Sequence, residues 1–186
     1  MAHLTTDQLR AGLAHITASP SDRGTLDLIV RRPASGEREA LDAGTLDPAD
    51  GLVGDNWRRR AGPDLEDDPS YAETQITVMN SRVIALIAQD ASRWALAGDQ
   101  LFVDFDLSQS NLPPGTRLTL GTSILEVSAE PHTGCRKFVA RFGLDAMKFV
   151  NSPLGTDLRL RGINARVVRG GTIRLGDVIA KAPATT

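Results

Sequence analysis

The sequence predicts a mainly β, α+β fold: a closed or partly open β-barrel with peripheral helices. Two observations carry this prediction. From Gly98 onward, short runs in which apolar and polar residues alternate follow one another, and this is the period of a strand with one buried face. Turns that contain Gly and Pro, such as Asn111 to Gly115, separate these runs. Many short strands divided by such turns are typical of all-β barrels and sandwiches.

The first 20 residues predict a helical appendage to the barrel. Apolar residues recur there with the i, i+4, i+7 spacing of an amphipathic helix, at Leu9, Leu13 and Ile16. Thr5 or Thr6 is expected to cap this helix. The barrel domain is then expected over residues 21–182, followed by a tail over residues 183–186.

The next segment predicts two strands, a helical turn and a loop. Half-buried strands are expected over residues 26–30 and around Leu41. Asp47-Pro48 has the residue types of a helix N-cap followed by Pro at the first helical position, so one short helical turn is expected there. Residues 58–73 are polar, with arginines first and acidic residues after, and predict a long solvated loop.

The remaining elements alternate between strands and short helices. A strand over residues 75–79 precedes two helices, one capped by Asn80 or Ser81 and one by Asp90. Further helices are expected directly after Cys135 and over residues 147–150. Gly170-Gly171 predicts a hairpin turn. The other strands are expected over residues 101–105, 118–120, 124–128, 163–167 and 173–179.

Composition argues against several classes of function. The chain has 186 residues, with 21 Lys+Arg against 23 Asp+Glu and 4% aromatic residues. This charge balance argues against a nucleic-acid binder, and the scarcity of aromatic residues argues against a base-stacking surface. No apolar stretch approaches the roughly 20 residues of a membrane-spanning helix, and residues 1–10 lack the pattern of an export signal. A cytoplasmic protein with no membrane partner is therefore expected.

The basic residues are mostly Arg, which binds phosphate or carboxylate in bidentate fashion better than Lys does. Genomic base composition is the alternative explanation of this excess.

The sequence lacks the common cofactor and metal motifs. It contains no G-x-G-x-x-G, no Walker A loop and no H-E-x-x-H. One Cys and three His argue against structural zinc. The alternating polar residues from Asp104 to Ser110 resemble an EF-hand loop, but Gln109 and Gly115 stand where Gly and Glu are required, so no calcium is expected.

The most informative segment surrounds Cys135, the single cysteine. It is expected at a loop-to-helix boundary, where the positive helix N-terminus favours the thiolate, the form that acts as nucleophile or metal ligand. Arg136 and Lys137 follow it, and His132 precedes it by three residues. Cys135 and His132 are therefore the candidate catalytic residues. The alternatives are that Cys135 is a small buried hydrophobic residue and that His132 only caps backbone carbonyls.

Taken in order, these segments resemble a MOSC domain, the family named from the C-terminal domain of molybdenum-cofactor sulfurase. The resemblance extends over roughly residues 26–180. The matching segments are residues 51–55, 75–78, 110–115, 131–135, 161–167 and 170–177. The resemblance implies a β-barrel of MOSC type. It also implies a site for the molybdenum cofactor (molybdopterin), or for a related sulfur-bearing ligand, centred on Cys135.

The resemblance also implies roles for individual residues. Cys135 would ligate molybdenum or carry a persulfide, since both roles use a soft thiolate. The candidates for holding the phosphate of the pterin, by charge and position, are Arg136, Lys137 and Arg161. Asn111 and Asp55 are candidates for bonding the pterin amides. The alternative for both residues is that their side chains only stabilise their own turns.

The function implied by the resemblance is that of a small oxidoreductase component. It would reduce N-hydroxylated or related small substrates with electrons from a separate reductase, because the sequence has no flavin, haem or iron–sulfur motif. The alternative is a non-catalytic cofactor or sulfur carrier with a persulfide on Cys135, supplied by a separate sulfur-donor protein. A third interpretation is a MOSC fold in which Cys135 is merely structural.

The chain departs from the family pattern at two places. Ser110 stands where the family commonly has Glu, and Asn56-Trp57 stands where it often has His. The rim that faces the substrate is therefore expected to differ from that of the better-known reductases.

Overall fold

Seven β-strands close into a barrel in the computed structural model of the chain, which describes residues 2–61 and 69–183. The strands follow the order β11-β7-β8-β9-β5-β6-β1, and β1 pairs again with β11. Only β5 and β6 are parallel neighbours in this barrel. The predicted α+β barrel is therefore confirmed. The strands are β1 (Arg23–Arg31), β5 (Ile76–Asn80), β6 (Leu101–Asp104), β7 (Arg117–Leu120), β8 (Ser123–Val127), β9 (Ile163–Arg169) and β11 (Val178–Lys181).

A second, smaller antiparallel sheet lies beside the barrel. It consists of β10 (Gly171–Arg174), β3 (Ala43–Asp47) and β4 (Gly51–Leu52), while β2 (Glu39–Leu41) pairs with β1. The expected hairpin at Gly170-Gly171 is wrong, because β9 belongs to the barrel and β10 pairs with β3. Alternation of apolar residues identifies a strand but does not identify the strand with which it pairs.

This sheet also corrects the helical turn expected at Asp47-Pro48. Asp47 is the last residue of β3. Its Oδ1 accepts hydrogen bonds from the backbone N–H groups of Ala49 and Asp50, at 2.8 and 3.1 Å. Asp has the same effect in tight turns as at a helix N-cap, since its side chain satisfies nearby N–H groups. Asp47 and Pro48 therefore begin the turn that connects β3 to β4.

The inside of the barrel is filled with side chains. Leu26, Val103, Leu125 and Ile163 belong to one buried hydrophobic cluster contributed by the barrel strands. Burying each such side chain contributes about 1.5–3 kcal/mol to stability. Because side chains fill small barrels in this way, a ligand site is expected at the outside or the rim of this barrel.

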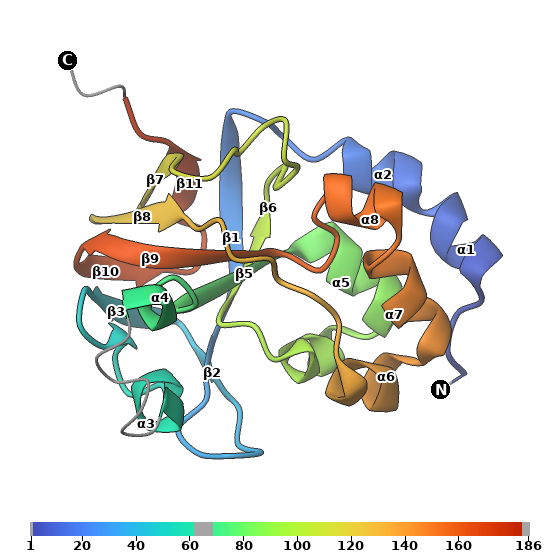
Figure 1. Ribbon diagram of the computed structural model, residues 1–186, viewed down its shortest axis with the longest axis horizontal. Helices are drawn as coiled ribbons and strands as arrows, with labels where there is room; N and C mark the ends of the chain where they lie inside the picture. Colours follow the sequence, from blue (N-terminus) through green and yellow to red (C-terminus); the bar gives the residue numbers. More distant parts are fainter. Residues whose placement is uncertain (1, 62–68, 184–186) are drawn as a thin grey trace.

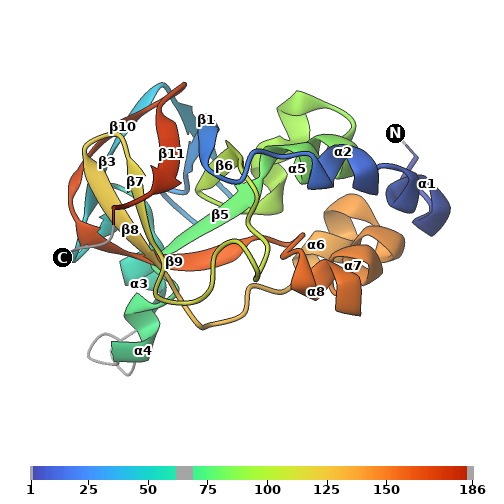
Figure 2. The ribbon, with the colours of Figure 1, turned by 90° about the horizontal axis from the view of Figure 1, so that it is seen from above.

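Helices gather on one side of the barrel (Figures 1 and 2). Their apolar faces meet in a second buried cluster that includes Leu9, Phe102, Phe138 and Phe149. Leu9 and Ile16 are both buried there, so the N-terminal helices share this core. The helices are α1 (Thr6–Ala11), α2 (Leu13–Thr17), α5 (Ser81–Ala88), the 3-10 helix η1 (Ala91–Ala97), α6 (Arg136–Phe142), α7 (Leu144–Val150) and α8 (Pro153–Asp157).

The expected helix caps are present. Thr5 forms a capping box with Gln8 at the start of α1. Asn80 accepts from two backbone N–H groups of α5, and Asp90 accepts from the N–H of Ser92 in η1. The predicted domain boundary after residue 20 stays a prediction, and residues 184–186 of the predicted tail lie outside the described part of the chain. Among the described residues, no helix has the length and apolar character that a membrane span requires.

The polar stretch over residues 58–73 is not a continuous loop. It includes parts of two short helices, α3 (Trp57–Ala61) and α4 (Pro69–Ala72), while residues 62–68 of the predicted loop lie outside the described residues. The rings of Trp57 and Tyr71 stack with centroids 4.7 Å apart, and the Tyr71 hydroxyl donates to the Trp57 carbonyl at 2.7 Å. This aromatic pair joins the two helices. The charged residues around it are typical of a solvated loop, so the contact was not predicted from the sequence.

Candidate functional site

A cavity of about 430 Å³ contains the lone thiol of the chain. We call it the thiol cavity. Four of the residues singled out in the sequence line it: Cys135, His132, Lys137 and Arg161. The other lining side chains with polar or aromatic groups include Arg32, Arg38, Asn56, Trp57, Arg60, Tyr71 and Arg141. Residues from distant parts of the sequence therefore converge on Cys135.

Cys135 is the N-cap residue of α6, with an extended backbone (φ −121°, ψ 179°) and an exposed side chain. The expected loop-to-helix boundary is thus confirmed. Partial burial raises the pKa of the thiol, but the N–H groups of Phe138 and Lys137 and the charges of Arg161 and Lys137 outweigh it and lower the pKa. The sulfur makes no capping hydrogen bond, so the N–H groups act through their dipoles. Thiolate therefore forms more readily than on a free cysteine.

His132 lies in the wall of the thiol cavity with its side chain 15% exposed. Its Nδ1 is 3.4 Å from Oδ1 of Asp99, yet this buried atom has no hydrogen-bond partner of good geometry. Burial, and then the charge of Arg161, lower the pKa of His132 to about 4, against the opposing effect of Asp99. The imidazole is therefore neutral near pH 7.

Arg161 is anchored by a buried ion pair with Asp99. Its Nη1 lies 3.0 and 2.7 Å from the two carboxylate oxygens, and its Nη2 donates to the Ala97 carbonyl at 3.1 Å. The guanidinium carbon also lies 5.0 Å from the ring centroid of Phe138 in α6, a cation–π geometry. Its Nε is buried without a partner. Asp99 was not predicted as a site residue, because in the sequence it is only a polar residue that precedes an apolar strand.

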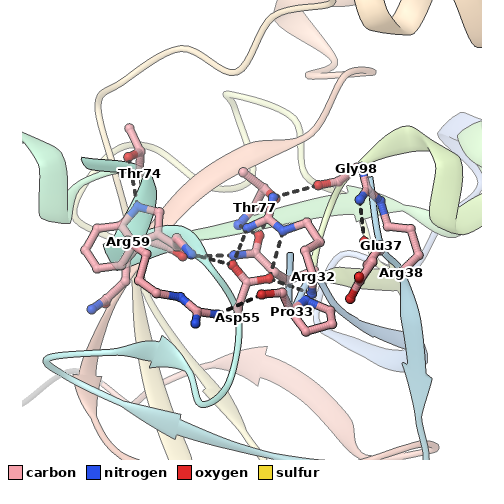
Figure 3. A network of polar contacts seen from close by, with 12 residues as sticks. Arg32, Pro33, Glu37, Arg38, Asp55, Arg59, Thr74, Thr77 and Gly98 are labelled. Atoms are coloured by element: carbon pink, nitrogen blue, oxygen red, sulfur yellow. Dashed lines mark hydrogen bonds and ion pairs between the residues drawn. The ribbon is translucent and has the colours of Figure 1, made fainter. Parts of the chain in front are cut away.

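Arg32 is held in the same way by Asp55 (Figure 3). Nε and Nη2 of Arg32 each donate to a different Asp55 oxygen at 2.8 Å, and Nη1 donates to the Gly98 carbonyl at 2.8 Å. The backbone N–H groups of Arg32 and Trp57 also donate to Asp55, both at 2.9 Å. This carboxylate is therefore fully engaged in fixing Arg32 and the turn that begins α3.

The other four cations of the thiol cavity have no carboxylate partner among the described residues. These are Arg38, Arg60, Lys137 and Arg141. Burial, and then the charges of Arg141, Arg32 and Arg60, lower the pKa of Arg38. Burial and the charge of Arg32 lower the pKa of Arg60. No Asp or Glu is among the described lining residues, so the cavity concentrates positive charge.

Three sequence candidates do not line the thiol cavity. Arg136 is exposed and does not line the cavity, although it adjoins Cys135. Asp55 is buried behind Arg32. Asn111 lies in a different region, where its Nδ2 donates to the carbonyls of Ser21 and Asp106 and its Oδ1 accepts from Lys181. A binding role for these three stays a prediction.

Four lining cations were not identified from the sequence: Arg32, Arg38, Arg60 and Arg141. The excess of Arg over Lys was the available signal, but it carried no positions. Within the described part of the chain, no three His, Cys, Asp or Glu side chains are grouped so that they could hold a metal ion.

The fold is similar to that of several solved structures. A crystal structure titled as a hypothetical protein matches with a TM-score of 0.60 and 16% identity, covering 88% of this chain and 69% of that chain. YuaD from Bacillus subtilis matches with a TM-score of 0.55 and 17% identity, covering 84% and 94%. YiiM from Escherichia coli matches with a TM-score of 0.55 and 15% identity, covering 87% and 71%.

YuaD and YiiM are MOSC-domain proteins. The fold is MOSC-like. At these identities the likeness concerns the fold alone. No protein-family model matches the sequence, and no curated protein matches it.

Proposed function

We propose that the thiol cavity binds the molybdenum cofactor, with Cys135 as the protein ligand of the metal. One observation carries the proposal: an exposed thiol of lowered pKa shares a cavity with four cations that have no carboxylate partner among the described residues. A thiolate prefers a soft metal or sulfur centre. Unneutralised guanidinium groups prefer phosphate, which they bind through paired hydrogen bonds. A ligand with both chemistries fits this cavity.

The unsatisfied polar atoms support the same fit. Six buried side-chain atoms have no hydrogen-bond partner among the described residues, and four of them belong to residues that line the thiol cavity. These are Arg38 Nε, Asn56 Oδ1, His132 Nδ1 and Arg161 Nε. Each buried unsatisfied group costs about 1–3 kcal/mol, and a bound ligand would recover that cost. Arg38 and Arg161 offer donors to a phosphate, and Asn56 offers an acceptor to the N–H groups of a pterin.

Each residue then has a defined task. The charges of Lys137 and Arg161 help to lower the pKa of Cys135, while Asp99 and Asp55 hold Arg161 and Arg32 in place without entering the cavity. The bound cofactor would supply a molybdenum centre that exchanges electrons with a substrate. His132 is neutral, so it can exchange a hydrogen bond with a bound molecule without adding charge.

The activity that follows is that of a small reductase component. It acts on N-hydroxylated or related small substrates and takes electrons from a separate protein. The second candidate function is a sulfur carrier, which is favoured by the exposure of Cys135 together with its lowered pKa. Those two properties are what persulfide formation requires.

The deciding experiment is analysis of protein purified from a host that makes the cofactor. We expect molybdenum and pterin at one equivalent per chain, lost in Cys135→Ser and retained in Arg23→Gln, which removes an exposed cation of β1 outside the cavity. A protein without molybdenum that carries an extra sulfur atom on Cys135, detected by mass spectrometry, supports the carrier. If Cys135→Ser changes neither ligand content nor activity, both functions are excluded.

A further inference from the structure

The wall of the thiol cavity that contains His132 and Arg161 has a second face. A separate cavity of about 230 Å³ adjoins it, and His132, Arg161 and Asn164 line both. Thr133 lines this second chamber, whereas Cys135, two residues later, lines the thiol cavity. The segment over residues 131–135 therefore separates two chambers that share a polar wall.

The Arg159 side chain brings unused hydrogen-bond donors to the second chamber. Of the five N–H donors of the Arg159 guanidinium, one, on Nη1, donates to the Leu112 carbonyl at 2.5 Å. Two acceptors of the lining are engaged: Asn151 Oδ1 accepts from the Gly134 N–H at 2.8 Å, and Ser128 Oγ accepts from the Glu130 N–H at 2.9 Å. Donors without acceptors call for an acceptor-rich ligand.

The second chamber contains charges of both signs. Arg159 and Arg161 line it together with one carboxylate, the exposed Glu130. Arg161 is already balanced by Asp99, while Arg159 has no ion-pair partner among the described residues. Burial lowers the pKa of Arg159, and an Arg that is desolvated without a carboxylate partner favours an anionic ligand.

The backbone at Arg159 is also unusual. Its φ is +48°, in the left-handed region, which residues other than Gly, Asn and Asp seldom adopt. A hydrogen bond from the Gly162 N–H to its carbonyl, at 2.8 Å, helps to hold this turn. Strained residues of this kind persist where the surrounding structure fixes them, and they cluster at functional sites.

We propose that the second chamber binds a small organic carboxylate between Arg159 and Arg161. Binding of a carboxylate in this chamber does not depend on the proposed function of the thiol cavity.

The test is titration of the cofactor-free protein with benzoate, followed by backbone amide NMR, with benzamide as the neutral control. We expect shifts at Gly155 and Gly162, which line the second chamber, and binding of benzoate at least about tenfold tighter than that of benzamide, as loss of a charged hydrogen bond predicts. Equal binding of the two compounds overturns the proposal. So do benzoate shifts confined to Gly36 and Gly98, which line the thiol cavity.

Variants separate the chamber from general charge effects. Arg159→Gln should weaken benzoate binding about tenfold by removing one charged donor. Thr156→Trp, at an exposed position on the chamber lining, should block binding by filling the space even if Arg159→Gln fails to fold. Arg23→Gln removes an exposed charge elsewhere and should leave benzoate affinity unchanged. Benzoate binding that survives Thr156→Trp overturns the proposal.

A third measurement connects the two chambers. Benzoate beside Arg161 should reduce the stabilisation of the Cys135 thiolate by that residue and slow its alkylation by iodoacetamide. This readout requires no cofactor. Benzoate binding without any molybdenum in the cofactor-host preparation contradicts the proposed function and leaves the chamber standing. Molybdenum at one equivalent without benzoate binding contradicts the chamber alone.

Discussion

Asp99 and Arg161 form a buried ion pair, with 2.7 Å between Oδ2 and Nη1, in the wall that separates the two chambers. The carboxylate is completely buried and the Arg161 side chain is 7% exposed. Removing one partner from such a pair leaves an uncompensated charge out of water. Arg161 also lowers the pKa of the Cys135 thiol, so this pair affects both the stability of the fold and the thiol.

The first prediction concerns Asp99→Asn, which leaves Arg161 buried without its counter-charge. We expect a loss of about 3–5 kcal/mol in the free energy of unfolding, the usual cost of breaking a buried pair, measured by urea denaturation. The matched control is Asp104→Asn, which breaks the partly exposed pair with Arg82 at 2.8 Å and should cost at most about 1 kcal/mol. Equal losses of unfolding free energy in the two variants would contradict the conclusion that Asp99 and Arg161 form a buried pair on which stability depends.

The second prediction concerns the Cys135 thiol. Its pKa, taken from the pH dependence of alkylation, should lie below the value of about 8.5 for a free cysteine. Lys137→Gln should raise it, because the charge of Lys137 is one of the groups that lower it. Arg136→Gln is the matched control: Arg136 adjoins the thiol in sequence but does not line the cavity, so this change should leave the pKa in place. A shift in the control and none in Lys137→Gln would reverse the roles of these neighbours.

Those two adjacent residues show what the sequence could and could not provide. The order of charges around Cys135 predicted a thiolate at a helix start, and the start of α6 is there. The direction in which Arg136 and Lys137 project depends on the helix phase and on the packing of Phe138 and Phe142 into the helical core. That choice was not available from the local sequence.

The barrel could be predicted from the sequence to a greater extent than the lining of the thiol cavity. Alternation and capping are local properties, so the strands and the caps at Asn80 and Asp90 were predictable. Arg32 and Arg38 lie in the segment between β1 and β2, and Arg141 lies in α6, so they meet only because closure of the fold brings these parts together. The positions of these arginines in the sequence follow no local pattern, so they could not show that the three side chains line one cavity.

The third prediction concerns pH. The pKa of His132 is lowered to about 4 in the folded chain from an ordinary value of 6.5. Between these values the unfolded chain binds the proton and the folded chain does not, so stability falls as the pH falls through this window. The full effect, present above pH 6.5 and lost near pH 4, is roughly 3 kcal/mol.

Urea denaturation across the same pH window tests this linkage. His132→Gln should flatten the dependence of the unfolding free energy on pH, whereas His15→Gln, at an exposed position of α2, should preserve it. An unchanged slope in His132→Gln would show that other groups control the pH dependence.

The last prediction concerns the cations of the thiol cavity. Burial, and then the neighbouring charges of Arg141, Arg32 and Arg60, disfavour the charged form of Arg38, so Arg38→Gln should relieve this cost in the ligand-free protein. We expect a gain of about 0.2–1 kcal/mol in the free energy of unfolding at low salt, the scale of partly exposed charge pairs, and a smaller gain at high salt because salt screens the repulsion. Cofactor content in the same variant should fall, because Arg38 is one of the proposed donors to the phosphate. Arg174→Gln, on β10 of the small sheet, should change neither quantity. Loss of stability together with loss of cofactor would mean that Arg38 serves the fold, whereas opposite changes identify a charge maintained for its ligand at the expense of the empty protein.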